Sequence, residues 1–259
     1  MDAIDYVNSK YVRELASKKM REDNREPFSY REISIAKGII NNAEGSAQVD
    51  LGATRVMAGV KMVVESPMED TPDVGNLVVS AELLPLASPD FESGPPSPES
   101  IELSRVVDRG VRAAECIDLG SLLIEEGKAW SVYLDLYILN YDGNLFDAGM
   151  LAAMSALKSA KVPKYSNGKP VMSERVAPLK INNTVSSCTF AKIGDTIVLD
   201  PTGNEERAAD ARMTIETDGK VIRAMQKGLS GSFNRQEISE MIDIAFGKHS
   251  ELKAHIDKG

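Results

Sequence analysis

The chain has 259 residues, 42% of them hydrophobic, which is enough apolar material for one large core, or for a large lobe with a smaller one attached. Its formal net charge is -9 at pH 7. Affinity for nucleic acid depends mainly on Lys and Arg side chains that neutralise phosphates, so this charge argues against a protein that coats RNA with its whole surface. Any RNA contact is expected from a local basic cluster, or from a surface that another subunit completes.

Secreted, membrane and zinc-binding classes are also disfavoured. The N-terminal segment mixes charged and apolar side chains and has no secretory signal, and the most apolar stretches, 77–87 and 131–141, are shorter than the roughly 20 residues of a membrane helix. Cys116 and Cys188 lack the CxxC spacing of a zinc site. We therefore expect a cytoplasmic protein that binds no membrane, with no metal site and no cofactor.

The N-terminal segment, residues 2–22, has the pattern of an amphipathic helix. One row of residues recurs at a spacing of three to four, and charges fill the rest of the segment. This row consists of Ile4, Val7, Tyr11, Leu15 and Lys18. The row is predicted to form the apolar side of the helix.

Three strand-like runs follow, rich in Val, Met and Leu and separated by turn residues, and they predict an antiparallel meander. They are residues 46–51, 54–65 and 74–84. The Pro- and Ser-rich segment 85–100 is predicted to be a surface loop. Ser100 or Ser104 is then expected to cap a helix that extends to about residue 119.

The middle of the chain predicts a strand followed by a buried helix. Over residues 130–139, Val132, Leu134, Leu136 and Ile138 alternate with Tyr133, Asp135 and Tyr137, which indicates a strand with one apolar face. Residues 145–162 combine high helix propensity with small apolar residues on all sides, as in a helix packed closely on a sheet.

The last third repeats this alternation of strands and helix. Strands are predicted at 185–191, 195–199, 212–217 and 220–226, with an irregular segment at 201–211 and a C-terminal helix from about Asn234. Residues 45–60 and 186–201 share a faint pattern of strand, Gly-containing turn and strand. This pattern hints at a duplicated architecture.

Three arginines form the strongest candidate for a contact with RNA. Arg105, Arg109 and Arg112 recur at i, i+4 and i+7 of the predicted helix and therefore share one face. Guanidinium groups bind phosphates through a fork of donors, so such a row could follow an RNA backbone. The alternative is a solvated face on which the arginines pair with Glu102, Asp108 and Glu115.

Acids and histidines supply weaker candidates. Five aspartates lie near predicted strand ends, where catalytic carboxylates and magnesium ligands often occur, but acids are also common there as turn and cap residues. These are Asp135, Asp142, Asp147, Asp195 and Asp200. His249 and His255 lie six residues apart on one helix, so they do not share a metal, and both are expected to be exposed.

Several segments resemble the RNase PH family. GSAQVDLGATRVMAGV resembles its strand, Leu-Gly-x-Thr turn and second strand. Three others resemble the archaeal exosome subunits of this family that lack catalysis, namely ELLPLASPDFESGPPSPESIELSRVVDRGVRAAECIDL, WSVYLDLYILNYDGNLFDAGMLAAMSAL and VLDPTGNEERAADARM. The resemblance covers approximately residues 1–250. It implies an RNase PH-like α/β (α+β) fold, with mixed sheets, packed helices and two lobes.

The chain departs from the active members at two places. Active members resemble QADGGTRT before the buried helix, where an Arg and a hydroxyl residue hold the attacking phosphate. The corresponding segment here is NYDGNLFD, which places Phe146 and Asp147 at those positions. A phenyl ring offers phosphate no donor, and a carboxylate repels it.

The second departure concerns a pair of acids. Active members carry them in a segment that resembles LDLNxEEDxxxEADM, where one acts as metal ligand or general acid. Here Arg212 takes the place of the second acid, and the first aligns with Glu206 or Arg207. Phosphorolysis needs phosphate in line with the scissile bond and a balance for the developing charge. The resemblance therefore implies a non-catalytic subunit that has no catalytic residue of its own.

In this family an inactive subunit pairs with an active one, and three such pairs form a hexameric ring around a channel for single-stranded RNA. The resemblance implies a catalytic RNase PH-like partner, RNA-binding cap proteins and a role in 3′-to-5′ phosphorolytic RNA degradation. Arg105, Arg109 and Arg112 are then expected to bind RNA beside the partner's active site. The expected domains are residues 1–184, with the N-terminal helix, and 185–259.

Two other functions stay open on the sequence. The first is a catalytically competent phosphorolytic exoribonuclease that uses Asp195 or Asp200. The second is a structural ring spacer that never contacts RNA.

Overall fold

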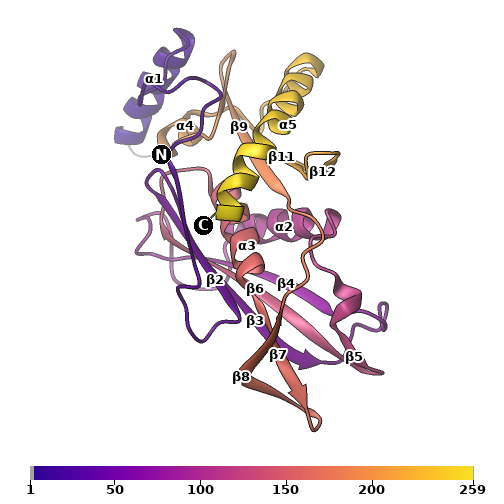
Figure 1. Ribbon diagram of the computed structural model, residues 1–259. Coiled ribbons are helices and arrows are strands. Elements are labelled where there is room, and N and C mark those ends of the chain that lie inside the picture. The colour runs from indigo at the N-terminus through magenta and orange to yellow at the C-terminus, as the bar shows by residue number, and fades with distance from the viewer. Residues whose placement is uncertain (1–2, 259) are drawn as a thin grey trace.

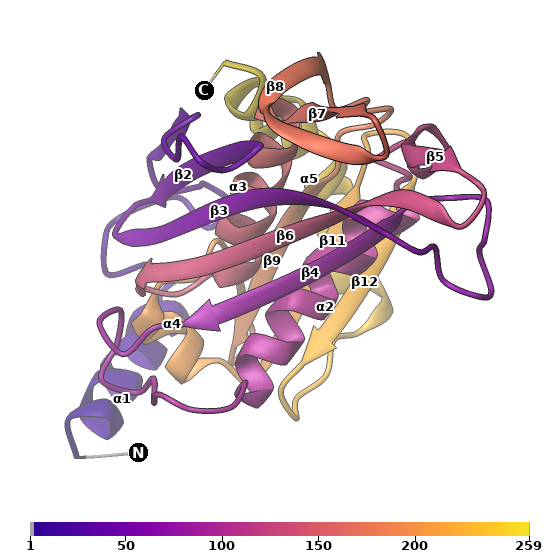
Figure 2. The ribbon, with the colours of Figure 1, turned by 90° about the horizontal axis from the view of Figure 1, so that it is seen from below.

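The computed structural model describes residues 3–258, and it contains two main sheets with helices between and around them (Figure 1). The larger sheet has the strand order β1-β2-β3-β6-β4, with β5 paired to β6. Its strands are β1 Ile33–Lys37, β2 Gly45–Leu51, β3 Thr54–Glu65, β4 Asn76–Leu83, β5 Leu123–Glu125 and β6 Lys128–Asn140. Helices α2 (Pro98–Ala113) and α3 (Leu145–Ser159) pack on one face of this sheet (Figure 2).

The smaller sheet has the order β10-β9-β11-β12 and is antiparallel throughout. Its strands are β9 Ser186–Ile193, β10 Thr196–Leu199, β11 Ala211–Thr217 and β12 Ile222–Gly228. The short helix α4 (Gly203–Ala208) follows β10, and the long helix α5 (Arg235–Lys258) packs on β9 and β11. The two segments with a shared sequence pattern form the hairpins β2–β3 and β9–β10, one in each sheet.

Helix α3 is the centre of the core, because it contacts β2 and β3 of the larger sheet and β9 of the smaller one. Every residue from Phe146 to Leu157 is buried. A helix enclosed on all sides is expected to be largely apolar, and only Asp147 and Ser155 of this stretch are polar, so the predicted buried helix is confirmed. Apolar side chains of both sheets therefore join one continuous core around it.

The predicted meander is wrong in its third strand. Strands β2 and β3 are antiparallel neighbours as expected, but β4 pairs in parallel with β6 and not with β3. Parallel pairing requires a long crossover, and α2 supplies it between β4 and β6. The strand pattern alone does not specify which neighbour a strand selects.

The boundaries of two helices also differ from prediction. Helix α2 begins at Pro98, because the Ser97 side chain caps it by accepting from the backbone N–H of Ser100, so neither Ser100 nor Ser104 is the cap. The segment predicted as irregular contains α4, which starts with a capping box between Thr202 and Glu205. Strand β1 and the hairpin of β7 (Lys161–Ser166) and β8 (Lys169–Pro178) were not predicted.

Helix α1 (Ala3–Ser17) is turned relative to the predicted face. Val12 and Ala16 are buried, whereas Val7 and Tyr11 are exposed. Its buried side packs against a small cluster from the second half of the chain, which includes Val198 and Ala208. In the described part of the chain, no helix is long and apolar enough to cross a membrane.

We expect Gly45→Ala to destabilise the fold strongly. An added Cβ would overlap the backbone oxygen of Ala156 and lie 2.7 Å from Cα of Ala160, at the end of α3. Because backbone cannot move aside as a flexible side chain can, a loss of roughly 1–3 kcal/mol or more in unfolding free energy is expected. Urea unfolding measures this loss of stability. Gly59→Ala in β3 serves as the control, because a Cβ at that position would meet no atom within 4 Å. Equal stability of the two variants would contradict this packing.

Candidate functional site

The three predicted arginines all lie exposed on α2, but their partners differ. Arg112 forms an ion pair with Asp108 at 2.7 Å and donates to the carbonyl oxygen of Leu77. Arg109 donates to the side-chain oxygen of Gln226 at 2.8 Å. Arg105 makes no hydrogen bond or ion pair with any residue that the structure describes. The row is therefore one surface, in which Arg105 is the guanidinium most available to a ligand.

A chain of polar contacts leads from this row to the interior. Gln226 also approaches the carboxylate of Glu102, and Glu102 forms an ion pair of 2.6 Å with Arg212. The Arg212 guanidinium carbon lies 4.3 Å from the centre of the Phe146 ring, a cation–π contact. The row on α2 is thus connected to β11 and to the start of α3.

The two sequence positions that depart from active relatives therefore touch each other. Phe146 is buried, and the side chain of Arg212 is 17% exposed. The guanidinium thus lies between an aromatic ring and Glu102, while its buried Nε has no hydrogen-bond partner among the described residues. The pair places a cation against an aromatic ring at the start of α3.

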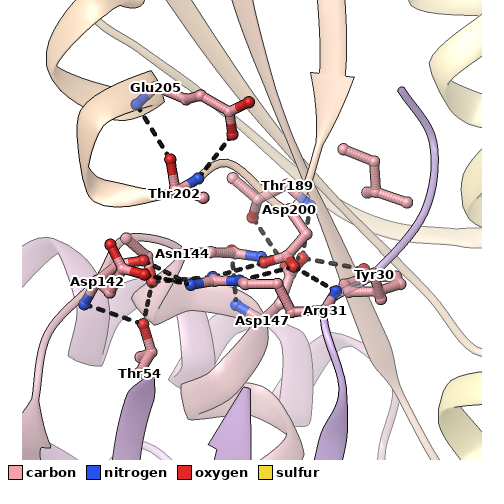
Figure 3. A network of polar contacts seen from close by, with 12 residues as sticks. Tyr30, Arg31, Thr54, Asp142, Asn144, Asp147, Thr189, Asp200, Thr202 and Glu205 are labelled. Carbon is pink, nitrogen blue, oxygen red and sulfur yellow. Dashed lines mark hydrogen bonds and ion pairs between the residues drawn. The ribbon is translucent and has the colours of Figure 1, made fainter. Parts of the chain in front are cut away.

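Asp147 lies in a buried hydrogen-bond network (Figure 3). Its carboxylate accepts from the hydroxyls of Tyr30, Ser187 and Thr189 at 2.8–2.9 Å, and from the backbone N–H of Thr189. Asn144, which caps α3 in a left-handed conformation, donates to the same carboxylate at 2.9 Å. Burial raises the pKa of Asp147 to about 6, although these donors act in the opposite direction.

Asp200 is the second carboxylate of this network and is fully buried. It forms ion pairs with Arg25 at 2.9 Å and Arg31 at 2.8 Å, and accepts from the Asn144 side chain at 2.7 Å (Figure 3). Arg31 also donates to the carbonyl oxygen of Asp142 at 2.6 Å. Removal of one partner from a buried ion pair typically costs about 3–5 kcal/mol, so these pairs hold three distant segments together.

Two glutamates of α4 complete the network. Arg21 and Glu205 form an ion pair of 2.6 Å in which both side chains are almost fully buried. Glu206 accepts from the Tyr141 hydroxyl at 2.7 Å and from the backbone N–H of Asn144 at 2.9 Å. Burial raises the pKa of Glu206. Glu206, one of the two residues that align with the first acid of active relatives, is thus hydrogen-bonded at the start of α3.

The N-terminus of a helix normally attracts an anion, because its backbone N–H groups and its dipole both favour negative charge. At α3 the anions belong to the protein itself: Asp147, Asp200 and Glu206 lie there, and their donors are described above. A phosphate ion would meet three carboxylates at this place. The arrangement supports a structural function for this network and not phosphate chemistry.

The other candidates have separate structural environments. Asp135 lies within β6, not at its end, and accepts from the Ser80 hydroxyl at 2.6 Å. Asp195 is exposed in the turn between β9 and β10. His249 was predicted to be exposed, but it is buried, with only 6% of its surface exposed, because α5 packs it against β9. There its Nδ1 lies 2.9 Å from the Ser186 hydroxyl oxygen. No group of His, Cys, Asp and Glu in the described residues could hold a metal ion.

The arginines of the network were missed by sequence reasoning. Arg21, Arg25 and Arg31 lie in the polar segment after α1, which has neither helical nor strand periodicity. Their density in a short segment was the one available signal. Their partners are about 170–180 residues away, a separation that no local pattern reveals.

Beneath the arginine row lies a buried acid, Glu216 of β11. It is 1% exposed, and neither carboxylate oxygen has a hydrogen-bond partner among the described residues. It lies so close to Gly110 of α2 that a Cβ on that glycine would come within 2.8 Å of the carboxylate. Burial raises the pKa of Glu216 to about 8, with Arg109 lowering it and Asp147 raising it further.

We therefore expect Glu216→Gln to change the pH dependence of stability. The folded pKa lies above the unfolded one, so the wild type loses stability as pH rises from about 4.5 to 8, by at most about 1.4 kcal/mol per unit of pKa difference. Glutamine cannot ionise, so the variant should match the wild type near pH 4 and exceed it at pH 9. Urea unfolding across this range measures the difference, with exposed Glu240→Gln as control, and parallel pH profiles would refute the assignment.

The comparisons with known proteins agree with this fold. Family models for the 3′ exoribonuclease family match residues 29–163 (domain 1) and 183–248 (domain 2). The chain is 44% identical to the exosome complex component Rrp42 of Methanothermobacter thermautotrophicus, covering 100% of this chain and 97% of the relative. It is 45% identical to that of Thermococcus gammatolerans, covering 90% and 88%.

Solved structures give the same result. A chain of the Archaeoglobus fulgidus exosome with RNA bound to the active site superimposes with a TM-score of 0.91 at 39% identity, covering 98% of this chain and 99% of that one. A chain of an archaeal exosome core gives a TM-score of 0.88 at 35% identity, covering 98% of both. The RNase PH-like fold predicted from the sequence is thereby confirmed. The chain belongs to the 3′ exoribonuclease (RNase PH) family, among the exosome complex component Rrp42 proteins.

Proposed function

We propose that this protein is the non-catalytic RNase PH-like subunit of an archaeal exosome, a 3′-to-5′ phosphorolytic RNA-degrading complex. The observation that carries the proposal is the contact between Phe146 and Arg212, beside a helix terminus occupied by the protein's own carboxylates. An enzyme of this family needs donors for phosphate and an unpaired acid at these positions. Here Phe146 and Arg212 occupy these positions, and they contact each other and, through Arg212, Glu102.

A catalytic function through Asp195 or Asp200 is disfavoured by their surroundings. Asp200 is buried and bound by two arginines, so it cannot reach a substrate. Asp195 is exposed in a turn. Both acids therefore have structural explanations.

The protein is further proposed to act in the cytoplasm, within a hexameric ring of three pairs with its catalytic homologue, to which RNA-binding cap proteins attach. The similar solved chains come from an archaeal exosome core and from an exosome with bound RNA, which supports this assembly. We also propose a domain division at residues 1–184 and 185–259. The separate sheets of residues 33–140 and 186–228 support it.

Single-stranded RNA is proposed to contact the row of Arg105, Arg109 and Arg112. The row gives an acidic protein one local basic surface, which is sufficient for contacts that track an RNA backbone. Arg105 has no competing partner among the described residues, whereas Arg112 is held by Asp108.

The isolated chain is expected to show no phosphate-dependent shortening of RNA, whereas a mixture with the catalytic homologue should degrade RNA faster than that homologue alone. The missing activity follows from the absence of a phosphate ligand at α3. Radiolabelled RNA and inorganic phosphate measure both, and mass determination gives the stoichiometry. Robust phosphorolysis by the purified chain alone would exclude the non-catalytic assignment.

Arg105→Ala should weaken RNA binding by the reconstituted ring and reduce the salt dependence of that binding by about one unit of slope for one lost phosphate contact. Fluorescence anisotropy with single-stranded RNA at several salt concentrations measures both. Exposed Arg235→Ala at the start of α5 serves as control. If a triple Glu variant of the row leaves affinity and slope unchanged, the ring spacer becomes the better description.

A further inference from the structure

Arg109 differs from the other two arginines of the row in the way it is held. Its Nη2 donates to the side-chain oxygen of Gln226 on β12 at 2.8 Å, and it makes no other hydrogen bond or ion pair within the part of the chain that the structure describes. Arg112 is paired with a carboxylate, that of Asp108, at 2.7 Å, whereas Arg105 has no polar partner among the described residues. Arg109 is therefore the arginine of the row that is held by an uncharged group alone.

The Gln226 side chain has one orientation that satisfies both of its neighbours. Arginine can only donate hydrogen bonds, and a carboxylate can only accept them. The amide oxygen therefore faces Arg109, and the amide nitrogen lies 3.4 Å from the carboxylate of Glu102. Glu102 is in turn fixed by its ion pair of 2.6 Å with Arg212. This chain of contacts orients the amide, and the amide orients the guanidinium.

Because its partner is an amide, Arg109 keeps its full positive charge. A carboxylate at the same distance would offset much of the attraction between the guanidinium and a phosphate. Two acids lie close to this arrangement, and neither neutralises Arg109. Glu102 is paired with Arg212, and burial raises the pKa of Glu216 to about 8, so that its carboxyl is largely protonated at pH 7. The nitrogens of Arg109 that do not face Gln226 remain as donors for a ligand.

The orientation of Arg109 matters for binding because an arginine side chain has many rotamers. A mobile arginine loses this freedom when it binds a phosphate, and the loss opposes binding. Gln226 restricts Arg109 before any ligand arrives, so less freedom is lost. Arg105 has to be ordered on binding, and Arg112 has to share its charge with Asp108.

We propose that Gln226 is a positioning residue for RNA, which holds Arg109 in an orientation that binds a phosphate of the RNA backbone and does not neutralise its charge. The inference rests on the proposed function, because it assumes that RNA contacts the row on α2. Strand β12 lies beside α2 (Figure 2), so the smaller sheet would also take part in RNA binding.

The test measures RNA binding by the ring reconstituted from the full chain and its catalytic homologue, in buffer without inorganic phosphate, so that no phosphorolysis occurs. Gln226→Met nearly keeps the length of the side chain and removes the acceptor, whereas Gln226→Glu keeps an acceptor and adds a charge. Gln226→Ala removes the same acceptor and replaces the methionine variant if that variant disturbs β12. Gln236→Met, at an exposed glutamine of α5, is the matched control.

Thermal unfolding checks that each variant is folded like the wild type, and fluorescence anisotropy at several salt concentrations gives the affinity and its salt dependence. Gln226→Met should weaken RNA binding about two- to tenfold, because Arg109 is no longer ordered in advance. It should leave the salt dependence near that of the wild type, since Arg109 keeps its charge. Gln226→Glu should reduce the salt dependence by about one unit of slope, as Arg109→Ala does, because it neutralises the guanidinium.

A double-mutant cycle assigns the effect to the contact between the two side chains. In an Arg109→Ala background, Gln226→Met should cause no further loss of RNA affinity. An equal loss in both backgrounds would overturn the inference, because the glutamine would then act independently of Arg109. Wild-type affinity of Gln226→Met, or a wild-type salt dependence of Gln226→Glu, would overturn it as well.

The failure of this inference can be told from the failure of the proposed function. If Arg105→Ala weakens RNA binding and the Gln226 variants do not, only the positioning function of Gln226 is wrong. If the triple Glu variant of the row binds RNA like the wild type, the proposed contact between RNA and the row is wrong, and the inference falls with it.

Discussion

The buried carboxylate of Asp200 is the interaction on which the architecture depends. It lies between Arg25 and Arg31 of the segment after α1, the Asn144 cap of α3 and the end of β10. A fully buried charge is tolerable only when it is paired and hydrogen-bonded. Displacement of any one of these segments would leave a buried charge without its partner, at a large cost in free energy. The N-terminal segment, the central helix and the smaller sheet are thereby fixed relative to one another.

The same network of carboxylates determines the surroundings of the start of α3. A site built for phosphate keeps its donors free, whereas the donors around α3 here are already used by Asp147, Asp200 and Glu206. Phe146 and Arg212 pack against one another. Contacts that stabilise the fold therefore use these side chains, whereas the outward surface of α2 carries three exposed arginines.

The sequence predicted what depends on local pattern and missed what depends on distant pairing. Periodicity and composition gave helix α3, strand β6 and the hairpins β2–β3 and β9–β10, because each buries side chains at its own repeat. Local sequence patterns could not predict the parallel pairing of β4 with β6, or the ion pairs of Arg25 and Arg31 with Asp200. In each case the partners are far apart in the sequence, and a short segment carries no information about a distant partner. The resemblance identified Phe146 and Arg212 as departures, and only the structure revealed that they touch.

The position of α1 has a consequence for how the protein is made. This helix is synthesised well before the segments that it contacts: Val12 and Ala16 pack with Val198 and Ala208, and Arg13 pairs with Asp210. During synthesis on the ribosome, α1 cannot dock until the smaller sheet has emerged, and the apolar side of the helix stays exposed to solvent until then. The docking of α1 is thus a late step of folding, which follows the translation of the smaller sheet and of α4.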